Sequence, residues 1–358
     1  MRVLHVITGL AAGGAETQLR LLLQHSRHDA DVVSLYNPGV VAAGLRSDGV
    51  SVTDLDMTSN LDVTAVAALA RLMRQGRYDV VHTHLYRACL YGRTAARLAG
   101  VPRIVATEHS LMNGQLEGHT AGPLVRALYR GTERLGQRTI AVSAAVREQL
   151  LAWGLAPERV VHVPNGLALD ALAYSPERRA AGRELLGIPQ DATVIGTLGR
   201  LHKGKRCDLL LAAAAPLLGP ERMLLLVGAG PEREALEAQA RDLGVADFVV
   251  FGGELPAGAV LSAMDVFASP SAAETFGLAI LEALASGLPT VYRNCPALDE
   301  LGAPVDTALH LADDSVETLR AGLEKALAGA GPRTCPPELA ALDITAVARA
   351  IDDLYESL

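Results

Sequence analysis

The stretch Ser-Pro-Ser-Ala-Ala-Glu-Thr-Phe-Gly-Leu-Ala-Ile-Leu-Glu-Ala-Leu-Ala-Ser-Gly-Leu-Pro, residues 269–289, decides how the second half of the chain is organised. Residues 265–268 have the apolar character of a buried strand end. Residues 277–286 have that of a helix, which Gly287-Leu288-Pro289 ends. This pattern places Glu274 in the turn before the helix and Glu282 inside it.

The predicted start of this helix is suited to binding an anion. The first backbone N–H groups of a helix have no partner inside it, so those near Phe276, Gly277 and Leu278 face outward with the positive end of the helix dipole. Between Leu278 and Ala285 every residue other than Glu282 is apolar, which predicts a helix buried on all sides. Because an unpaired buried carboxylate is costly, we expect Glu282 to have a polar partner.

Strand-like segments alternate with helical patterns along the chain, which is typical of parallel sheets covered by helices. A polar stretch, residues 175–183, follows Val163-Pro164-Asn165-Gly166, and this predicts two doubly wound α/β domains, residues 1–166 and 167–340. Ligands of such folds gather at the carboxyl ends of strands, so we expect the site in a cleft between the domains. The expected strands are residues 3–8, 31–35, 51–55, 79–83, 104–108, 139–142, 160–163, 193–198, 223–227, 248–251, 265–268, 290–292 and 308–311.

Composition narrows the class of protein. The chain has 358 residues, 50% of them hydrophobic, with no apolar run long enough to span a membrane and no secretory signal pattern. Its four cysteines form no CxxC pair, so we expect neither a zinc ribbon nor a disulfide framework, and we expect a cytoplasmic location. Residues 1–165 hold 17 basic and 13 acidic residues (net +4), and the remainder holds 15 and 27 (net −12). This balance argues against nucleic-acid binding.

A basic loop follows the first strand of the second domain, in Gly196-Thr-Leu-Gly-Arg-Leu-His-Lys-Gly-Lys-Arg-Cys-Asp. Two of the three lysines of the chain, Lys203 and Lys205, lie here beside Arg200. In a chain that otherwise uses arginine, compact ammonium groups at a strand end indicate phosphate binding. A basic turn that merely begins an exposed helix remains the alternative.

Glycines and histidines follow strands of the first domain. The loop Gly9-Leu-Ala-Ala-Gly-Gly-Ala-Glu16 is not a GxGxxG dinucleotide motif, but Gly13 and Gly14 permit close backbone approach to a ligand or serve a tight turn. The histidines at strand ends are His82, His84 and His109, and His82 and His84 share a strand face. No third ligand of obvious spacing accompanies that pair, so we predict no metal site. The DxD sequences at residues 29–31 and 54–56 are interpreted as solvated strand ends.

The spacing Glu274-x7-Glu282, after Ser-Pro-Ser and before Gly-Leu-Pro, resembles the E-x7-E signature of retaining glycosyltransferases of family 4, which have the GT-B fold. The resemblance extends over nearly the full length. It implies two Rossmann-like domains facing across a cleft, an acceptor-side domain at 1–166 and a nucleotide-sugar domain at 167–340. It also implies a terminal helix, 341–358, that crosses back onto the first domain.

The resemblance also implies roles for single residues. Glu274 would contact the donor sugar and Glu282 the ribose hydroxyls. Gly199, Arg200 and Lys205 would bind the donor diphosphate with the helix start at Phe276, Gly277 and Leu278. The family's base-lining loop corresponds to residues 251–256, which include Gly252, and His109 would lie beside the sugar. Gly13, Gly14 and His84 fall on the family's first-domain loops. The common Gly-Gly pair of the family is replaced by Cys295-Pro296.

These expectations describe a cytoplasmic retaining hexosyltransferase that needs neither metal nor cofactor. Its donor would be a UDP-sugar in preference to a GDP-sugar, and its acceptor a hydroxyl of a glycan, a lipid-linked sugar or a small molecule. A sugar-nucleotide 2-epimerase and a catalytically silent binding partner are the alternatives. The complete set of Glu274, Glu282, Arg200 and Lys205 disfavours both.

The segment 123–137 is predicted to be an amphipathic helix. Leu124, Leu128 and their apolar neighbours Val125 and Leu135 fall on one side, while arginines recur at every fourth position on another. The arginine stripe consists of Arg126, Arg130 and Arg134. Like charges at this spacing repel, so an anionic membrane surface or an anionic acceptor is a candidate partner, and simple solubilisation is the alternative.

Overall fold

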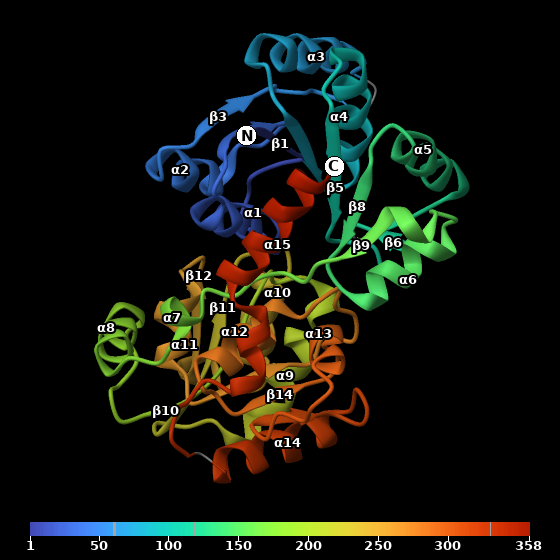
Figure 1. The fold of residues 1–358 in the computed structure, drawn as a ribbon. Coiled ribbons are helices and arrows are strands. Elements are labelled where there is room, and N and C mark those ends of the chain that lie inside the picture. The colour runs from blue at the N-terminus through green and yellow to red at the C-terminus, as the bar shows by residue number, and fades with distance from the viewer. Residues whose placement is uncertain (60–61, 113, 118, 330) are drawn as a thin grey trace. The chain divides into compact units, whose positions relative to one another are not determined.

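The computed structural model describes residues 1–59, 62–112, 114–117, 119–329 and 331–358. The chain divides into two compact units: unit 1 is Met1–Gly166 with Ile344–Leu358, and unit 2 is Leu167–Asp343. Each unit is a parallel sheet with helices on its faces (Figure 1), so the predicted α/β class with two doubly wound domains is confirmed. The segment that returns to unit 1 begins at Ile344, against the expected residue 341.

The sheet of unit 1 has the strand order β3-β2-β1-β4-β5-β8-β9. The order reverses between β1 and β4, whose register pairs His5 with His82 and Ile7 with His84. Buried aliphatic side chains such as Leu4, Val6 and Val81 form the core beneath this part of the sheet. The strands are β1 (Arg2–Ile7), β2 (Asp29–Ser34), β3 (Ser51–Asp54), β4 (Val80–His84), β5 (Arg103–Glu108), β8 (Arg138–Ala141) and β9 (Val160–His162).

The helices of unit 1 include the last helix of the chain, α15, which packs against α1. The buried carboxylate of Asp352 on α15 accepts hydrogen bonds from the hydroxyl of Ser26 (2.7 Å) and the backbone N–H of Arg27 (2.9 Å), just after α1. The expected return of the terminal helix to the first domain is thus present. The helices are α1 (Gly14–His25), α2 (Gly39–Ser47), α3 (Thr64–Gly76), α4 (Tyr86–Ala99), α5 (Pro123–Glu133), α6 (Ala144–Ala152), η1 (Pro157–Arg159) and α15 (Ile344–Ser357).

One small feature of unit 1 escaped sequence analysis. Two-residue strands β6 (Gln115–Leu116) and β7 (His119–Thr120) form an antiparallel pair in the segment between β5 and α5. Such short strands carry no readable alternation of polar and apolar residues.

The sheet of unit 2 has the order β12-β11-β10-β13-β14-β15, and its order reverses between β10 and β13. The core strand β11 is fully apolar from Met223 to Val227, as expected for a parallel strand covered on both faces. The strands are β10 (Thr193–Leu198), β11 (Arg222–Val227), β12 (Val249–Gly253), β13 (Val266–Ser269), β14 (Thr290–Tyr292) and β15 (Ala308–His310).

The helices of unit 2 bury leucine-rich faces against this sheet, with Leu210, Leu211 and Leu319 fully inaccessible to solvent. Of the helices in the described parts of the chain, none combines the length and apolar character needed to cross a membrane. The helices of unit 2 are α7 (Leu169–Leu172), α8 (Pro176–Leu186), η2 (Lys203–Lys205), α9 (Cys207–Ala214), η3 (Ala215–Leu217), α10 (Arg233–Asp242), η4 (Ala246–Phe248), α11 (Ala257–Ala263), α12 (Leu278–Ala285), α13 (Pro296–Glu300), α14 (Val316–Ala328) and η5 (Pro337–Leu342).

Candidate functional site

A pocket opens in unit 2 where the strand order reverses, at the carboxyl ends of β10 and β13. Successive crossover helices leave the sheet on opposite faces at such a point, and the gap between their loops is where open α/β sheets bind ligands. The pocket contains Lys205 and Glu274 and reaches the first turn of α12. Its lining residues are Thr197, Leu198, Gly199, Lys205, Cys207, Ser269, Glu274, Gly277, Ala279 and Ile280.

The central polar contact of this pocket is an ion pair between two predicted site residues. The ammonium Nζ of Lys205, in η2, lies 2.5 Å from the carboxylate Oε1 of Glu274. The carboxylate is the less accessible partner, with 13% of the Glu274 side chain exposed against 28% for Lys205. Glu274 is further held by its backbone N–H, which donates to the side-chain oxygen of Asn294 (3.1 Å). The structure therefore brings together two residues that lie 69 positions apart.

The start of α12 lies beside this ion pair, and it requires a glycine. Gly277, the N-cap, has φ of 96°, in the left-handed region that favours glycine. A Cβ at this position would overlap the thiol of Cys295, which lies against the backbone carbonyl of Phe276. The Cys295-Pro296 step thus packs directly beneath the predicted anion site. Phe276 has a buried side chain, and Leu278 is the first residue of the helix.

Glu282 differs from the expectation made for it. Glu282 is a half-buried residue that does not line the pocket, and its carboxylate makes no hydrogen bond or ion pair with the described part of the chain. The expected polar partner is therefore absent among the protein's described residues. Burial among the apolar side chains of α12 raises the pKa of this carboxyl to about 7.

The glycine turn Val227-Gly-Ala-Gly-Pro231, which follows β11, supports the basic loop. A Cβ at Gly228 would overlap the carbonyl oxygen of Gly199, and φ of Gly228 is 131°. The two loops are joined by backbone hydrogen bonds, from Gly199 N–H to Val227 O (3.0 Å) and from Leu201 N–H to Ala229 O (2.9 Å). The signal that could have found this contact is the Gly-x-Gly directly after a buried strand.

The remaining predicted residues of unit 2 are placed less centrally. Arg200 is exposed in the basic loop, where its charge and that of Lys205 add to burial in lowering the pKa of His202. Lys203 is exposed and does not line the pocket. Gly252 lies in the edge strand β12, beside Leu186 and Leu225 and away from the lining residues of the pocket.

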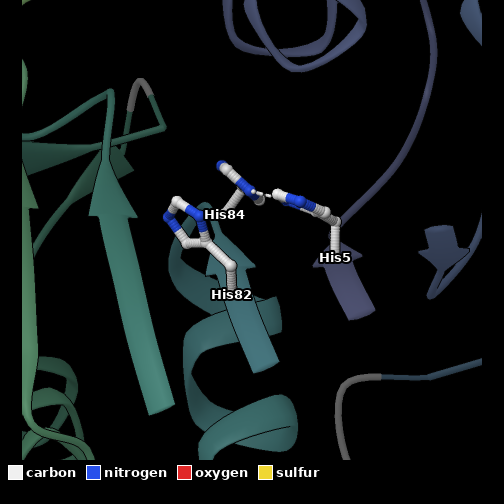
Figure 2. Close-up of side chains that lie close together, drawn as sticks. All are labelled: His5, His82 and His84. Carbon is white, nitrogen blue, oxygen red and sulfur yellow. Dashed lines mark hydrogen bonds between the residues drawn. The ribbon is translucent and has the colours of Figure 1, made fainter. Parts of the chain in front are cut away.

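In unit 1, four histidines gather where the strand order reverses between β1 and β4. His5, His82 and His84 are buried, and Figure 2 shows the rings of His5 and His84 pointing toward one another with His82 beside them. The His5 Nδ1 and His84 Nε2 atoms are 3.0 Å apart, and His84 Nδ1 lies 3.3 Å from His109 Nε2. Sequence analysis identified no third histidine near the pair on β4. The structure corrects this, because His5 pairs with His82 across the parallel ladder.

Three of these histidines are candidate metal ligands. One nitrogen from each of His5, His82 and His84 lies within 4.8 Å of the others. However, His82 uses both ring nitrogens on protein hydroxyls, with Nδ1 2.5 Å from the Tyr355 hydroxyl and Nε2 2.7 Å from that of Thr107. The nitrogens of His5 and His84 are directed at each other rather than at a common point. The imidazoles are therefore arranged as a hydrogen-bonded cluster. A tetrahedral zinc site would need their nitrogens to point at one common position.

His109 is fixed by the turn that carries it. The buried carboxylate of Glu108 accepts hydrogen bonds from the backbone N–H (2.9 Å) and the hydroxyl (3.1 Å) of Ser110 on the other side of His109. Burial raises the pKa of the Glu108 carboxyl. Burial also lowers the pKa of His109 to about 4. Glu108 was missed by sequence analysis, although an acid at the end of a buried strand beside a candidate histidine was visible there.

The glycine loop of unit 1 is arranged differently from the prediction. Gly13 is the N-cap of α1 with extended backbone, and Gly14 is the exposed first residue of that helix. Gly39, the first residue of α2, packs closely against this loop: its φ is 48°, and a Cβ there would overlap the backbone of Leu10 and Ala11. A second contact found only in the structure is the pair of hydrogen bonds between the Gln18 amide and the backbone of Gly166.

The predicted arginine helix is shorter than expected, because α5 ends at Glu133 and Arg134 is its C-cap. Its apolar side was predicted at Leu124 and Leu128, yet these side chains are 72% and 46% exposed, and Tyr129 and Glu133 are the buried residues. Arg126 donates to the backbone oxygen of Ala121 (3.0 Å) and lies over the ring of Trp153. The helix thus exposes both arginines and leucines.

Comparison with known proteins agrees with this architecture. The family model "Glycosyltransferase Family 4" matches residues 12–171, and "Glycosyl transferases group 1" matches residues 179–335. A relative named D-inositol 3-phosphate glycosyltransferase 2, from Catenulispora acidiphila, is 31% identical over 87% of this chain and 77% of its own length. The chain belongs to the family 4 glycosyltransferases.

Other relatives of this chain are matched over part of their length. A D-inositol 3-phosphate glycosyltransferase of Gordonia bronchialis is 33% identical over 71% of this chain and 59% of its own. The UDP-Gal:alpha-D-GlcNAc-diphosphoundecaprenol alpha-1,3-galactosyltransferase of Escherichia coli is 30% identical over 65% and 62%. The chain spans only 55–59% of the length of the first three curated relatives.

Solved structures confirm the GT-B fold of this family 4 member. Anabaena HepE in complex with UDP and glucose has a TM-score of 0.86 at 21% identity and covers 99% of both chains. The UDP-GlcNAc 2-epimerase of Methanocaldococcus jannaschii has a TM-score of 0.67 at 12% identity, covering 99% of this chain and 100% of its own. At these identities the likeness concerns the fold alone. Solved structures with this fold include a glycosyltransferase and an epimerase, so the fold does not distinguish the two activities.

The raised pKa of Glu282 predicts how stability depends on pH in this glycosyltransferase. At a pH between the unfolded value of 4.5 and about 7, the folded protein retains a proton that the unfolded chain has released. The free energy of unfolding should therefore fall as pH rises through this window, and Glu282→Gln should remove that part of the dependence. A ¹³C NMR titration of labelled glutamate carboxyls checks the assignment. A wild-type spectrum with no glutamate titrating near pH 7 would contradict it.

Proposed function

We propose that this chain is a retaining glycosyltransferase that transfers a sugar from a nucleotide diphosphate donor to an acceptor hydroxyl. The observation that carries the proposal is the Lys205–Glu274 ion pair beside the N-terminus of α12, at the reversal of strand order in a family 4 chain. Cations and free backbone N–H groups stabilise the charge that develops on a leaving diphosphate. A UDP-sugar is the favoured donor, because HepE, with the same fold, was crystallised with UDP and with UDP-glucose.

Roles follow for the residues around this pair. Lys205, Arg200 and the backbone at Gly199 bind the diphosphate together with the first N–H groups of α12 at Gly277 and Leu278. Glu274 contacts the donor sugar. In the free protein its carboxylate forms an ion pair with Lys205.

Three further groups complete the proposed donor contacts. The half-buried carboxylate of Glu282, which has no partner among the described residues, accepts hydrogen bonds from the ribose hydroxyls. His109 contacts the sugar, and the loop that contains Gly252 lines the base. Gly13, Gly14 and His84 are proposed on the acceptor or phosphate side. No cofactor is proposed.

An epimerase remains the second candidate, since the 2-epimerase of Methanocaldococcus jannaschii shares the fold. The relatives from Gordonia bronchialis and Catenulispora acidiphila, which are 33% and 31% identical, are named glycosyltransferases, and this favours transfer. Incubation with a UDP-sugar and an acceptor separates the two: new glycoside supports transfer, and appearance of the 2-epimer of the sugar nucleotide without glycoside contradicts it.

The role of Lys205 in binding the donor can be tested with a control from the same loop. Lys205→Ala and Arg200→Ala should each lower kcat/KM for the donor by about 10- to 150-fold, the worth of one charge-assisted hydrogen bond. Lys203→Ala removes the same charge from a residue outside the pocket and should have little effect. Calorimetric titration with UDP and steady-state kinetics provide the two measurements. Unchanged affinity and unchanged turnover in Lys205→Ala would contradict the assignment.

Glu274 offers a complementary variant, because it neutralises Lys205 in the free protein. In Glu274→Gln the ammonium is released from its ion pair, so binding of UDP should be unchanged or tighter while turnover falls. Parallel loss of UDP affinity and turnover would instead indicate that Glu274 serves only to hold the loop.

We also propose that transfer requires no divalent metal. The positive charge that a metal supplies in other enzymes would come here from Lys205, Arg200 and the helix dipole. Transfer rates should therefore be the same in excess chelator as in added Mg²⁺. Complete loss of activity that is reversed by metal would overturn this proposal. It would direct attention to His5, His82 and His84, the group of possible metal ligands found among the described residues.

The acceptor is proposed to be anionic or presented at the inner face of the cytoplasmic membrane. The names of two relatives refer to a phosphate and to a diphosphate-linked lipid. Residues 1–165 carry a net charge of +4, and α5 exposes Arg126, Arg130 and Leu124 on one short helix. Exposed apolar and cationic side chains together favour the interface of an anionic bilayer. A glycan or a small soluble molecule is the alternative acceptor.

Vesicle flotation tests this membrane contact. The protein should float with anionic vesicles at low salt and less at physiological salt, and it should not float with neutral vesicles. Changing Arg126, Arg130 and Arg134 to Gln should abolish flotation. Changing Arg71, Arg74 and Arg77, on and directly after α3, to Gln removes equal charge from exposed positions of the same unit and should not. Flotation lost equally in both variants, or absent throughout, would contradict the proposal.

A further inference from the structure

Three imidazoles form a hydrogen-bonded chain from the interior of unit 1 to the loop after β5. His5 Nδ1 lies 3.0 Å from His84 Nε2, and His84 Nδ1 lies 3.3 Å from His109 Nε2. The rings are stacked, with centroids 5.3 Å apart for His5 and His84 and 5.6 Å for His84 and His109. His82 lies beside the chain but is hydrogen-bonded to hydroxyl groups instead.

The imidazoles of this chain are neutral at physiological pH. Burial lowers the pKa of His5 to about 3 and that of His109 to about 4, and burial with neighbouring histidines places the pKa of His84 well below its ordinary value. A neutral imidazole has one N–H donor and one acceptor nitrogen. Because His84 is bonded on both sides, its single proton can serve only one of the two contacts, so both hydrogen bonds must run in the same direction.

Two proton arrangements satisfy this condition, and they differ at the end of the chain. If the bonds run outward from His5, His84 donates to His109 Nε2, and His109 carries its proton on Nδ1. If they run inward, His109 Nε2 donates to His84, and His109 Nδ1 is an acceptor. That Nδ1 atom is buried and has no partner among the described residues. A buried N–H without a partner is rarer in proteins than an unused acceptor, which favours the inward arrangement.

We propose that His84 and His5 are positioning residues that hold His109 in its Nε2–H tautomer, so that Nδ1 accepts a hydrogen bond from a hydroxyl of the donor sugar. The contact with a sugar hydroxyl rests on the proposed function. The tautomer of His109 is inferred from the hydrogen bonds of the histidine chain alone. The imidazole of His109 is then neutral, and its Nδ1 accepts the hydrogen bond that a sugar hydroxyl donates. His109 also lines a cavity of unit 1 with His84 and Thr107.

The tautomer is measured directly by NMR on protein labelled with ¹⁵N-histidine, in which protonated and unprotonated ring nitrogens have separate shifts. His109 is assigned by its loss in His109→Asn, and it should show a protonated Nε2 and an unprotonated Nδ1. A protonated Nδ1 in the wild-type protein would overturn the proposal. So would stoichiometric zinc bound by the purified protein, since a metal would replace the hydrogen bonds of the chain.

Variants then test the coupling. His5→Leu removes the acceptor for His84 and should change the tautomer populations of His109, whereas His5→Asn supplies a side-chain oxygen at the Nδ1 position and should restore them. His82→Leu is the matched control, because His82 is as buried and has two hydrogen bonds but lies outside the chain. Fluorescence of Trp153, the single tryptophan and a residue of unit 1, verifies that each variant is folded. An unchanged His109 spectrum in folded His5→Leu would contradict the proposal. If that variant does not fold, His84→Leu gives the same test, because it removes the acceptor for His109 Nε2.

Binding measurements separate this inference from the proposed function. In His5→Leu, affinity for the UDP-sugar should fall by about 2- to 12-fold, the worth of one neutral hydrogen bond, with UDP affinity unchanged. A wild-type protein that binds no UDP-sugar would refute the proposed function while the tautomer result still stands. Equal loss of UDP and UDP-sugar affinity in His5→Leu, but not in His82→Leu, would refute the positioning role.

Discussion

The reversal of strand order in each parallel sheet is the constraint on which the rest of the structure depends. Right-handed crossovers place successive helices on one face of a sheet until the order reverses, and the loops on either side of that point then diverge. In unit 2 the reversal lies between β10 and β13, and it brings the loop of Lys205 to that of Glu274. In unit 1 it lies between β1 and β4 and gathers His5 with His84. In each unit these polar side chains meet at the reversal of strand order, where the loops on either side diverge.

The polar groups at the two reversals of strand order differ in charge: one site holds an ion pair, and the other holds neutral imidazoles. In unit 2 a full ion pair is retained because both side chains keep some contact with water, which limits the desolvation cost of each charge. In unit 1 His5 and His84 are buried, and burial lowers the pKa of both imidazoles, which favours their neutral forms. An ionic ligand such as a diphosphate therefore suits the first site, and neutral hydroxyl groups suit the second.

The sequence predicted the sheets well because each strand is a local apolar segment bounded by turn residues. It also placed Glu274 in a turn and Glu282 in a helix, since the spacing of eight residues is read along one continuous segment. It could not show that Lys205 contacts Glu274, or that His5 joins His84, because these contacts depend on strand order and register across 69 and 79 residues. The exposed leucines of α5 were missed for a related reason: helical periodicity identifies an apolar side but does not say whether anything covers it.

The Lys205–Glu274 ion pair also sets a condition on how a donor binds. An ammonium already neutralised by a carboxylate 2.5 Å away attracts a diphosphate less than a free one, so binding must move or share that lysine. Under the proposed function, a single rearrangement would release the cation toward the phosphate and the carboxylate toward the sugar. In this arrangement the charge that stabilises the leaving group becomes available only when the donor is present, which is the differential interaction that catalysis requires.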